Sequence, residues 1–179
     1  MLISRLSNKT LLPLLLTPLM LFTACSSQAV EAKVAPTSSF SEEEMLHRAK
    51  DAYQEYVQTF TSIVQAGGAN PERMQAIVSP ELYLTERESY QQFSQDAIHG
   101  VGQASFFNFQ LENFSEHEVT ALACLDFSQF RIFNSENVDV TPAERSETTA
   151  FKLRWSFSGN QKLVLEESEI WSDQNICSQ

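Results

Sequence analysis

The sequence predicts a single α+β domain in which helices come first and an antiparallel sheet follows, and two features support this. Apolar residues recur at helical spacing from Met45 to Val64, whereas beyond Gly102 they alternate with polar ones. A period of 3.6 is typical of a helix with one buried face, and a period of 2 is typical of a half-buried strand. Helices followed by strands on short connections indicate an α+β layout.

Each expected helix has its own start and stop signals. Ser41 and Glu44 form a capping box, in which the serine accepts from a backbone amide and the glutamate reaches back. A capping residue precedes Pro71 and another precedes Pro80, and proline is favoured at the first helical position. Glycines end the first helix and, at Gly100, the third. The expected helical ranges are 41–66, 70–78 and 79–99.

Four strands are expected after Gly102, and each has one apolar face. Successive strand side chains point to opposite faces, so alternate apolar residues identify the face that packs against the helices. Gly159-Asn160 predicts a tight turn before a last strand over 163–171, and short connections favour antiparallel pairing. The residues expected to face the helices from the other three strands are Phe107, Phe109, Leu111, Val119, Ala121, Ala123, Leu125, Phe127, Phe151, Leu153, Trp155 and Phe157.

The N-terminus has the organisation of a secretory signal. Arg5 and Lys9 precede an apolar run, Leu11 to Phe22, which is too short to cross a hydrocarbon core that needs about 20 apolar residues. The run ends in Thr23-Ala24-Cys25, which resembles the lipobox of bacterial lipoproteins, with phenylalanine where leucine is usual. The resemblance implies cleavage before Cys25 and a diacylglycerol on its sulfur. An ordinary signal peptide with an incidental cysteine is the alternative.

The segment after Cys25 is small, polar and without periodicity, which is typical of a disordered tether. Two acyl chains hold a protein at a membrane more firmly than one, because each buried CH₂ adds about 0.8 kcal/mol. We therefore expect a lipid-anchored protein on the extracytoplasmic face of the cell membrane. The expected organisation is a lipoprotein signal peptide at 1–24, a flexible tether at 25–39 and one α+β domain at 40–179.

Charge and motif content exclude several classes of partner. The chain has 12 Lys and Arg residues against 23 Asp and Glu, a net charge of −11. A surface this acidic repels phosphate backbones, so nucleic acid is not an expected partner. The spacings of zinc, P-loop and dinucleotide motifs do not occur, and the three histidines lie far apart in the sequence, so neither a metal nor a cofactor is expected.

Cysteine usage predicts one disulfide. Lipidation of Cys25 would leave Cys124 and Cys177, and an even pair in an exported domain favours a bridge between them. Two separate thiols, one of them buried in a strand, are the alternative.

Several short stretches together resemble a known group of proteins. The stretches are "AYQEYV", "GGANPERM", "VSPELY", "CLDFS", "VTPAER" and "ESEIW" with a later cysteine, and they span residues 50–177. They resemble secreted actinobacterial lipoproteins with a nuclear transport factor 2-like (cystatin-like, polyketide-cyclase-like) domain. The resemblance implies a strongly curved antiparallel sheet that wraps the N-terminal helices into a cone, with a cavity between sheet and helices. It implies no reaction.

Aromatic side chains are the candidates for the lining of such a cavity. The chain has 13 Phe, 4 Tyr and 2 Trp residues, which indicates that a sizeable interior is being filled. The same side chains could form an ordinary core, and we expect that arrangement more than an open pocket. The candidate lining residues are Tyr53, Tyr56, Phe60, Tyr90, Phe93, Phe107, Phe109 and Trp155.

Two residues are the candidates for acid–base catalysis. Asp126 lies in an otherwise apolar or small stretch, and enzymes of the resembled fold hold an acid–base pair inside the cone. By alternation, Asp126 points away from the helices and pairs with an Arg or Lys of a neighbouring strand, unless a bulge reverses it. His99 is expected at a helix C-terminus, from which it could reach the mouth of the cone. No catalytic residue is assigned.

The sequence leaves three functional hypotheses. The preferred one is a non-catalytic, lipid-anchored domain that binds a protein or a small apolar ligand. The second is a small-molecule isomerase, dehydratase or cyclase that uses the cone cavity. The third is an envelope-assembly module that acts through its sheet face, where a homodimer could also form. An apolar pocket, an enclosed acid–base group and an exposed apolar sheet face would respectively distinguish them.

Overall fold

The computed structural model describes residues 40–178, and its first element is the long helix α1 (Glu42–Gln65). The Ser41 hydroxyl accepts the N–H of Glu44 at 3.2 Å, as the capping box predicts. Three glutamates in the first turn suit the positive end of the helix dipole. The predicted signal peptide, the tether and the Cys25 lipidation site lie outside the described residues.

The next two helices begin where the sequence predicts, but both are shorter than expected. Pro71–Ala76 forms a 3₁₀ helix, η1, and Asn70 before it is in the left-handed conformation (φ 57°) without capping it. In α2 (Pro80–Gln95), the Ser79 hydroxyl accepts the Leu82 N–H at 3.2 Å. The Ser79 N–H donates to the Leu165 carbonyl (2.8 Å) and the Leu165 N–H to the Ile77 carbonyl (2.9 Å), which ties the start of α2 to the sheet.

The predicted end of the third helix is wrong, because residues 98–102 form a strand. Ala97 has a positive φ of 50°, which turns the chain out of the helix into β1 (Ile98–Gly102). β1 pairs antiparallel with β4 (Phe130–Asn134), which was also missed. Gly100 serves packing here, since a Cβ would lie 2.3 Å from the Phe130 ring. His99 is therefore a strand residue and not a helix cap.

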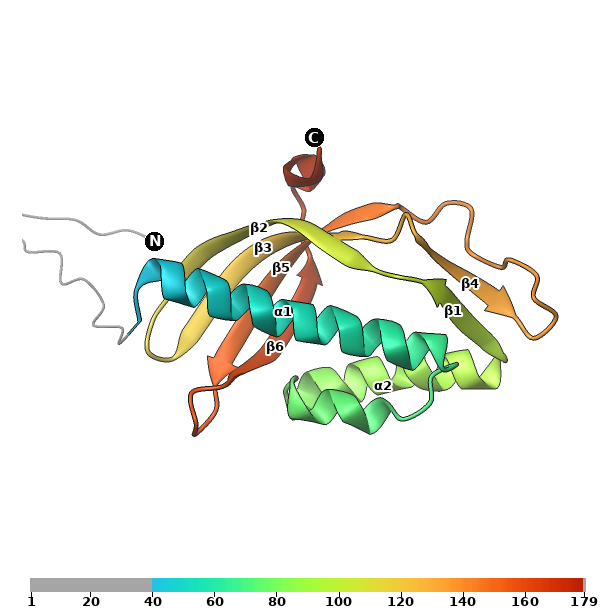
Figure 1. Ribbon diagram of the computed structural model, residues 1–179, viewed down its shortest axis with the longest axis horizontal. Coiled ribbons are helices and arrows are strands. Elements are labelled where there is room, and N and C mark those ends of the chain that lie inside the picture. Colours follow the sequence, from blue (N-terminus) through green and yellow to red (C-terminus); the bar gives the residue numbers. More distant parts are fainter. Residues whose placement is uncertain (1–39, 179) are drawn as a thin grey trace, which may run out of the picture. The chain divides into compact units, whose positions relative to one another are not determined.

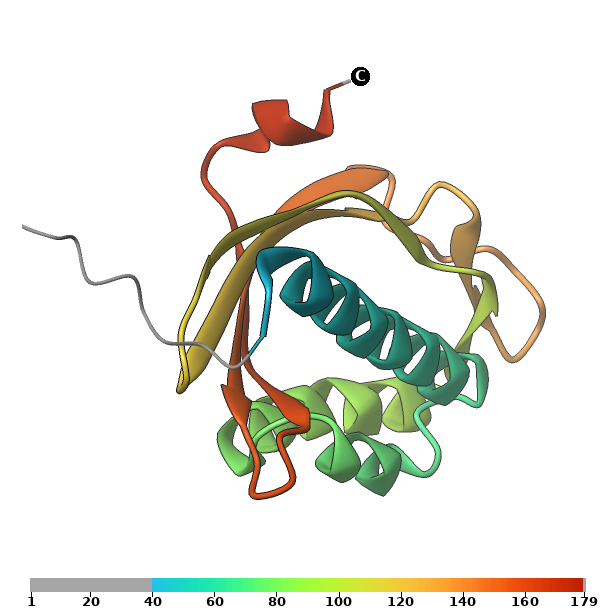
Figure 2. The same ribbon diagram turned by 60° about the vertical axis from the view of Figure 1, so that its left-hand side comes forward.

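The main sheet confirms an α+β fold. It contains β2 (Ser105–Phe114), β3 (Glu118–Asp126), β5 (Thr148–Phe157) and β6 (Leu163–Ile170) in the order β2-β3-β5-β6, and every pair is antiparallel. In Figure 1 α1 crosses in front of the main sheet. In Figure 2 the sheet curves around α1, and α2 lies on the other side of that helix.

The inward face of the sheet follows the predicted alternation except in β2. Val119, Ala121, Ala123 and Leu125 of β3 and Leu153 and Trp155 of β5 are buried as expected. In β2 the register slips between Phe107 and Gln110, where Asn108 has a positive φ of 48°. The bulge places Phe106 opposite Leu125 on the inner face and Phe107 opposite Cys124 on the outer face.

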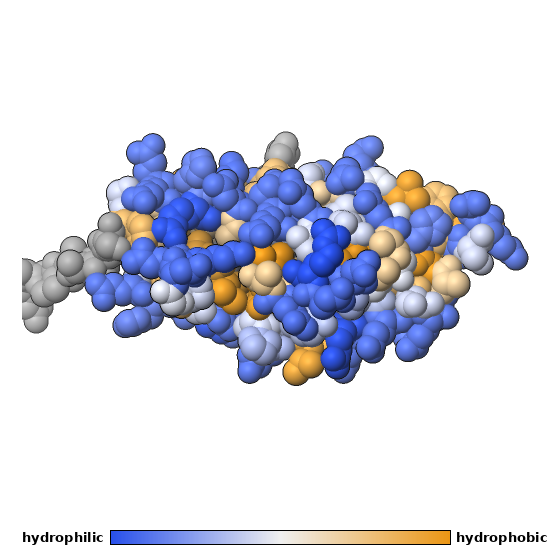
Figure 3. Space-filling view, turned by 60° about the horizontal axis from the view of Figure 1, so that its bottom comes forward, coloured by the Kyte–Doolittle hydropathy of each residue, from blue (hydrophilic) through white to orange (hydrophobic). Residues whose placement is uncertain are grey.

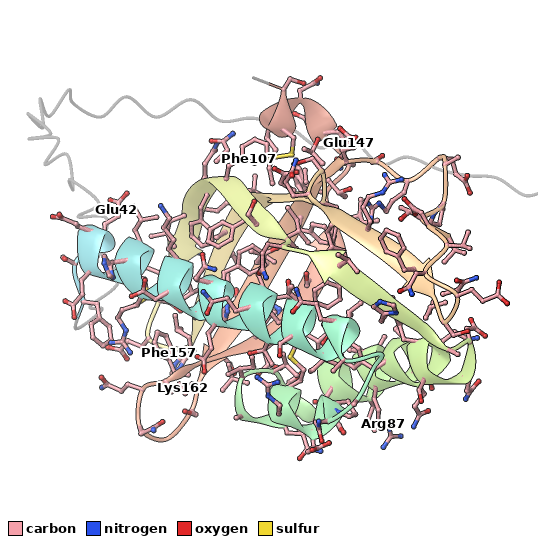
Figure 4. The ribbon with its side chains drawn as sticks, turned by 45° about the vertical axis from the view of Figure 1, so that its right-hand side comes forward. Glu42, Arg87, Phe107, Glu147, Phe157 and Lys162 are labelled. Carbon is pink, nitrogen blue, oxygen red and sulfur yellow. A yellow bond between two sulfur atoms is a disulfide. The ribbon has the colours of Figure 1, made fainter. Side chains whose placement is uncertain are left out.

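The inward assignment of Phe107 is therefore wrong, while that of Phe109 is correct. Phe109 follows the bulge and packs against Tyr53 and Trp155, with ring centroids 6.1 and 6.3 Å apart. Figure 4 shows Phe107 on the side of β2 remote from α1. Strand alternation alone could not place these two side chains, because one extra residue reverses the parity.

The predicted disulfide is present and fixes the C-terminal segment to the outer face of the sheet. Cys124 of β3 and Cys177 at the end of η2 (Gln174–Cys177) are bonded, with Cα atoms 5.5 Å apart. The Gln174 side chain accepts the Ala150 N–H at 2.8 Å, and Asn108 donates to the Ile176 carbonyl at 2.5 Å. The bulge residue of β2 thus also holds the tail.

Removing the bridge should destabilise the domain substantially. Cys124 and Cys177 are 53 residues apart, and closing such a loop is worth about 4 kcal/mol in the loop-entropy description. We expect the double variant Cys124→Ala/Cys177→Ala to lose about 2–4 kcal/mol of unfolding free energy in urea titrations. A loss below about 0.5 kcal/mol would mean that the disulfide contributes little by constraining the unfolded chain.

A matched pair of substitutions tests the bulge. Phe106→Ala removes an inward ring that packs 4.8 Å from the Tyr53 ring, so we expect a loss of about 3 kcal/mol. Phe107→Ala removes a ring from the outer face and should cost about 1 kcal/mol or less. Urea unfolding of both variants decides the parity, and a larger loss at Phe107 would contradict it.

Candidate functional site

Half of the predicted pocket residues meet in one aromatic cluster between α1 and the sheet. Tyr53 is its centre, fully buried, with its ring 4.8 Å from Phe106, 5.8 Å from Tyr56 and 6.4 Å from Trp155. Phe109 completes the cluster. Centroid distances of 4.5–7 Å are those of packed aromatic pairs, so these side chains fill the interior.

The remaining candidates separate into a second cluster, a rim and the outer face. Phe60 lies 6.3 Å from Tyr90 and 6.4 Å from both Phe127 and Phe130, where α1 and α2 meet the sheet. Phe93 packs at the edge of the core and also lines a surface hollow. With Phe107 on the outer face, the eight predicted residues do not line one cavity.

A carboxylate that the sequence analysis missed lies between the two aromatic clusters. Glu86 of α2 accepts hydrogen bonds from the hydroxyls of Tyr56 (2.5 Å, to Oε1) and Tyr90 (3.1 Å, to Oε2). Each carboxylate oxygen thus has one phenolic donor, and one of the donors comes from α1. This polar group, the Glu86–Tyr56–Tyr90 cluster, is the strongest candidate site in the part of the chain that the structure describes.

Burial dominates the electrostatics of this cluster. Desolvation raises the pKa of Glu86 above its ordinary value of 4.5, although the two tyrosine hydrogen bonds act in the opposite direction. Burial also raises the pKa of Tyr56 and of Tyr90, and the neighbouring Glu86 carboxylate raises both further. The phenols therefore act as hydrogen-bond donors at neutral pH, and Glu86 is the group that titrates.

Helical spacing in the sequence contained the signal for Glu86. Positions 82, 83, 86, 90 and 93 form one stripe on α2, and Tyr83 and Tyr90 on it are buried. A glutamate in the middle of an apolar stripe requires partners, and Tyr90 four residues later is within reach. Glu86 is therefore an ionisable residue that the predicted set of interior side chains did not include.

Asp126 and His99 both lie outside the interior. Asp126 is on the outer face opposite Ser105, and its carboxylate accepts the Ser128 N–H at 2.8 Å instead of pairing with an Arg or Lys. It borders an open hollow of about 460 Å³ together with Phe107 and Cys177. The His99 ring lies 6.4 Å from that of Phe133 in the β1–β4 pair. Neither residue contacts the Glu86–Tyr56–Tyr90 cluster.

The outer face of the main sheet is organised by ion pairs. Arg154 lies 2.5 Å from Glu167 and 3.7 Å from Glu118, and Lys152 lies 3.6 Å from Glu112. Glu166 accepts a hydrogen bond from the Ser156 hydroxyl, so Glu166 and Glu167 of β6 both have a side-chain partner on β5. Exposed pairs of this kind contribute about 0–1 kcal/mol each. The outer face of the described sheet is therefore charged, whereas the envelope-assembly hypothesis requires an exposed apolar face there.

The other surface features are shallow. A hollow of about 510 Å³ lies where α1 and α2 end, beside His99, and another of about 480 Å³ lies between α2 and β6. On the face seen in Figure 3, hydrophilic side chains predominate and apolar ones form small separate groups. Within residues 40–178, no cluster of three or more His, Cys, Asp or Glu side chains is placed to hold a metal ion. No helix in that range is long and apolar enough to span a membrane.

The hydroxyl of Tyr53 provides a test of how closed the interior is. It is buried, and no hydrogen-bond partner for it is found among the described residues. A buried unsatisfied hydroxyl costs about 1–3 kcal/mol, so we expect Tyr53→Phe to raise the unfolding free energy by about 1 kcal/mol. Urea titration measures this change. Phe60→Leu alters the packing of an aromatic side chain without removing a hydroxyl, so it serves as the comparison. A loss of stability in Tyr53→Phe would mean that the hydroxyl is bonded.

Comparison with known proteins supports the fold and nothing beyond it. No family model and no curated protein matches the chain. One solved structure of similar fold is the intermembrane space region of the chloroplast protein ARC6, with 7% sequence identity and a TM-score of 0.53. The match covers 70% of this chain and 95% of that one. A designed β-sheet protein is similar over 72% of this chain at 14% identity, but its TM-score is only 0.33.

Proposed function

We propose that the chain is a non-catalytic, lipid-anchored domain on the extracytoplasmic face of a membrane, and that it binds a protein partner through its surface. The observation that carries the proposal is the filled interior. Tyr53 and Trp155 are almost fully buried and contact each other and their aromatic neighbours at packing distance. An apolar ligand would have to displace these rings, so a small-molecule pocket under the sheet is disfavoured.

The proposed location rests on the N-terminal sequence and on the disulfide. The lipobox-like Thr23-Ala24-Cys25 supplies the proposed anchor, and two acyl chains are enough for stable attachment. The Cys124–Cys177 bridge agrees with an oxidising compartment, because such bonds persist outside the cytosol and are rare inside it. A tethered domain with a closed core and a polar surface is suited to transient contacts with another envelope protein.

An enzyme is the second candidate, and the Glu86–Tyr56–Tyr90 cluster is the specific observation that favours it. A partly buried carboxyl with a raised pKa beside two phenols is the kind of acid–base group that an isomerase, dehydratase or cyclase needs. Against this, both Glu86 oxygens already accept tyrosine hydroxyls, and Glu86 lines none of the three hollows described above.

An assembly role through the sheet face, with a homodimer as one form of it, has weaker support. The ion pairs of Arg154 and Lys152 occupy the centre of that face, and the C-terminal segment covers part of it. Obligate interfaces are usually more apolar than this. We therefore place the proposed partner contact elsewhere on the domain.

Native mass spectrometry of the full chain, extracted from membranes in detergent, tests the proposal. We expect the mass of the chain from Cys25 with its lipid and the disulfide, and no bound small molecule. A stoichiometric small ligand would overturn the protein-binding assignment in favour of a pocket. The variant Cys25→Ser should lose the lipid and remain as uncut precursor, whereas Cys177→Ser should keep the lipid. An unmodified N-terminus at another residue would contradict the anchor.

A further inference from the structure

We propose that the second half of β6, residues 166–170, is a docking edge for an extended, Lys- and Arg-rich segment of a protein partner, which adds a strand to the main sheet. The inference deepens the proposed function and rests on it, because it names where a protein partner would bind and by what chemistry. It starts from the sheet order β2-β3-β5-β6, in which β6 is an edge strand. An edge strand presents backbone groups that can pair with another chain.

The first half of this edge is already used by the chain itself. The segment before α2 runs parallel to β6, with Val78 paired to Leu165. The Leu165 N–H donates to the Ile77 carbonyl at 2.9 Å, and the Leu165 carbonyl accepts the Ser79 N–H at 2.8 Å. Pro80 then begins α2, and the pairing stops. The edge of β6 therefore has a geometry that accepts an extended segment.

Beyond Leu165 the edge has backbone groups that are open to pairing. The Trp171 N–H donates to the Ala150 carbonyl of β5 at 2.8 Å, so residue 171 points its backbone groups toward β5. These groups alternate between the two sides of an antiparallel strand, so those of Ser168 and Ile170 point away from β5. Within residues 40–178 no other segment pairs with them. The docking edge thus offers two N–H donors and two carbonyl acceptors.

Space and an apolar contact are available beside these groups. The hollow of about 480 Å³ between α2 and β6 is lined by Ser168 of the edge and by Leu82 and Thr85 of α2. At the end of the strand Ile170 is 71% exposed, which is the highest value among the large apolar side chains in the described part of the chain. An added strand would therefore find backbone partners, room and one apolar neighbour in the same place.

The charge of the hollow selects the partner. Its lining has four glutamates, Glu81, Glu166, Glu167 and Glu169, against one cation, Arg154. Arg154 is already paired with Glu167 at 2.5 Å. Neither Glu81 nor Glu169 has an ion pair among residues 40–178, so both carboxylates can accept Lys or Arg side chains. A second copy of this chain would bring glutamates to the same edge, so self-pairing is disfavoured and a basic segment is favoured.

Fluorescence anisotropy of the full chain in a neutral detergent tests the inference. The probe is a short labelled peptide of alternating lysine and valine. The control peptide has the same sequence with every backbone amide N-methylated, so it keeps the charge but cannot donate to a sheet. We expect the natural chain to bind the probe at least about tenfold more tightly than the control peptide. Equal affinities would mean attraction by charge alone and would overturn the docking edge.

Three variants locate the contact. Ser168→Pro removes an outward N–H, which an edge strand tolerates, and should weaken probe binding at least about tenfold. The double variant Glu81→Gln/Glu169→Gln should weaken it about threefold or more. Glu88→Gln makes the same kind of charge change at an exposed position of α2 that does not line the hollow, so it should bind like the natural chain. An unchanged affinity in Ser168→Pro, or an equal loss in Glu88→Gln, would refute the assignment.

Amide hydrogen exchange keeps the inference testable if Ser168→Pro does not fold. In the natural full chain the amides of Ser168 and Ile170 should exchange at least about tenfold more slowly when the lysine–valine peptide is bound. Unchanged exchange at both amides, or no binding of the peptide, would overturn the docking edge and leave the glutamates as guards against strand pairing. Either result leaves the proposed function standing, because native mass spectrometry tests that separately.

A concentration-dependent dimer of the natural chain that Ser168→Pro abolishes would also overturn the inference, since it would assign the edge to a second copy.

Discussion

The packing of Tyr53 against Trp155 and Phe106 is the interaction on which the rest of the folded unit depends. One helix supplies the central ring, and two non-adjacent strands of the sheet, β2 and β5, supply the rings that enclose it. A flat sheet could not reach around α1 from both sides, so burial of Tyr53 requires the curvature that Figure 2 shows. The bulge at Asn108 bends β2 and turns Phe106 inward, which lets the edge strand complete the enclosure.

The same bulge links the interior to the outer face. Because Asn108 leaves the ladder, its side chain is free to donate to the carbonyl of Ile176, next to the Cys124–Cys177 bridge. The C-terminal segment therefore lies beside the bulge of β2, and the disulfide holds it there. An enclosed aromatic core and a tail bonded across β3 leave a surface dominated by charged side chains, which is why we assign function to the surface and not to the interior.

Sequence periodicity predicted the parts of the fold that depend on local signals. The Ser41 cap, the starts of η1 and α2, the inward face of β3 and β5 and the disulfide all follow from residue type and spacing. β1 and β4 were missed because each has five residues, and Gly100 looks like a helix end although it makes room for Phe130. Phe107 was misplaced because nothing in the residue types around Asn108 indicates the extra residue in the ladder.

The candidate site was less predictable for a different reason. Glu86 was not among the residues singled out from the sequence, although its spacing from Tyr90 places both on one face of α2. The second donor, Tyr56, is 30 residues away in the chain, and only the packing of α1 on α2 brings it to the carboxylate. Sequence periodicity predicts which face of a helix is buried, but it does not predict which distant side chain a buried polar group contacts.

Aromatic NMR spectroscopy of the full chain tests the central claim, the closed interior, most directly. If Tyr53, Phe106 and Trp155 fill the space under the sheet, their rings should show mutual nuclear Overhauser effects, and xenon or a short alkane should leave their shifts unchanged. Saturable shifts at Trp155 on adding either apolar probe, together with weak contacts between these rings, would show an accessible cavity and contradict the account.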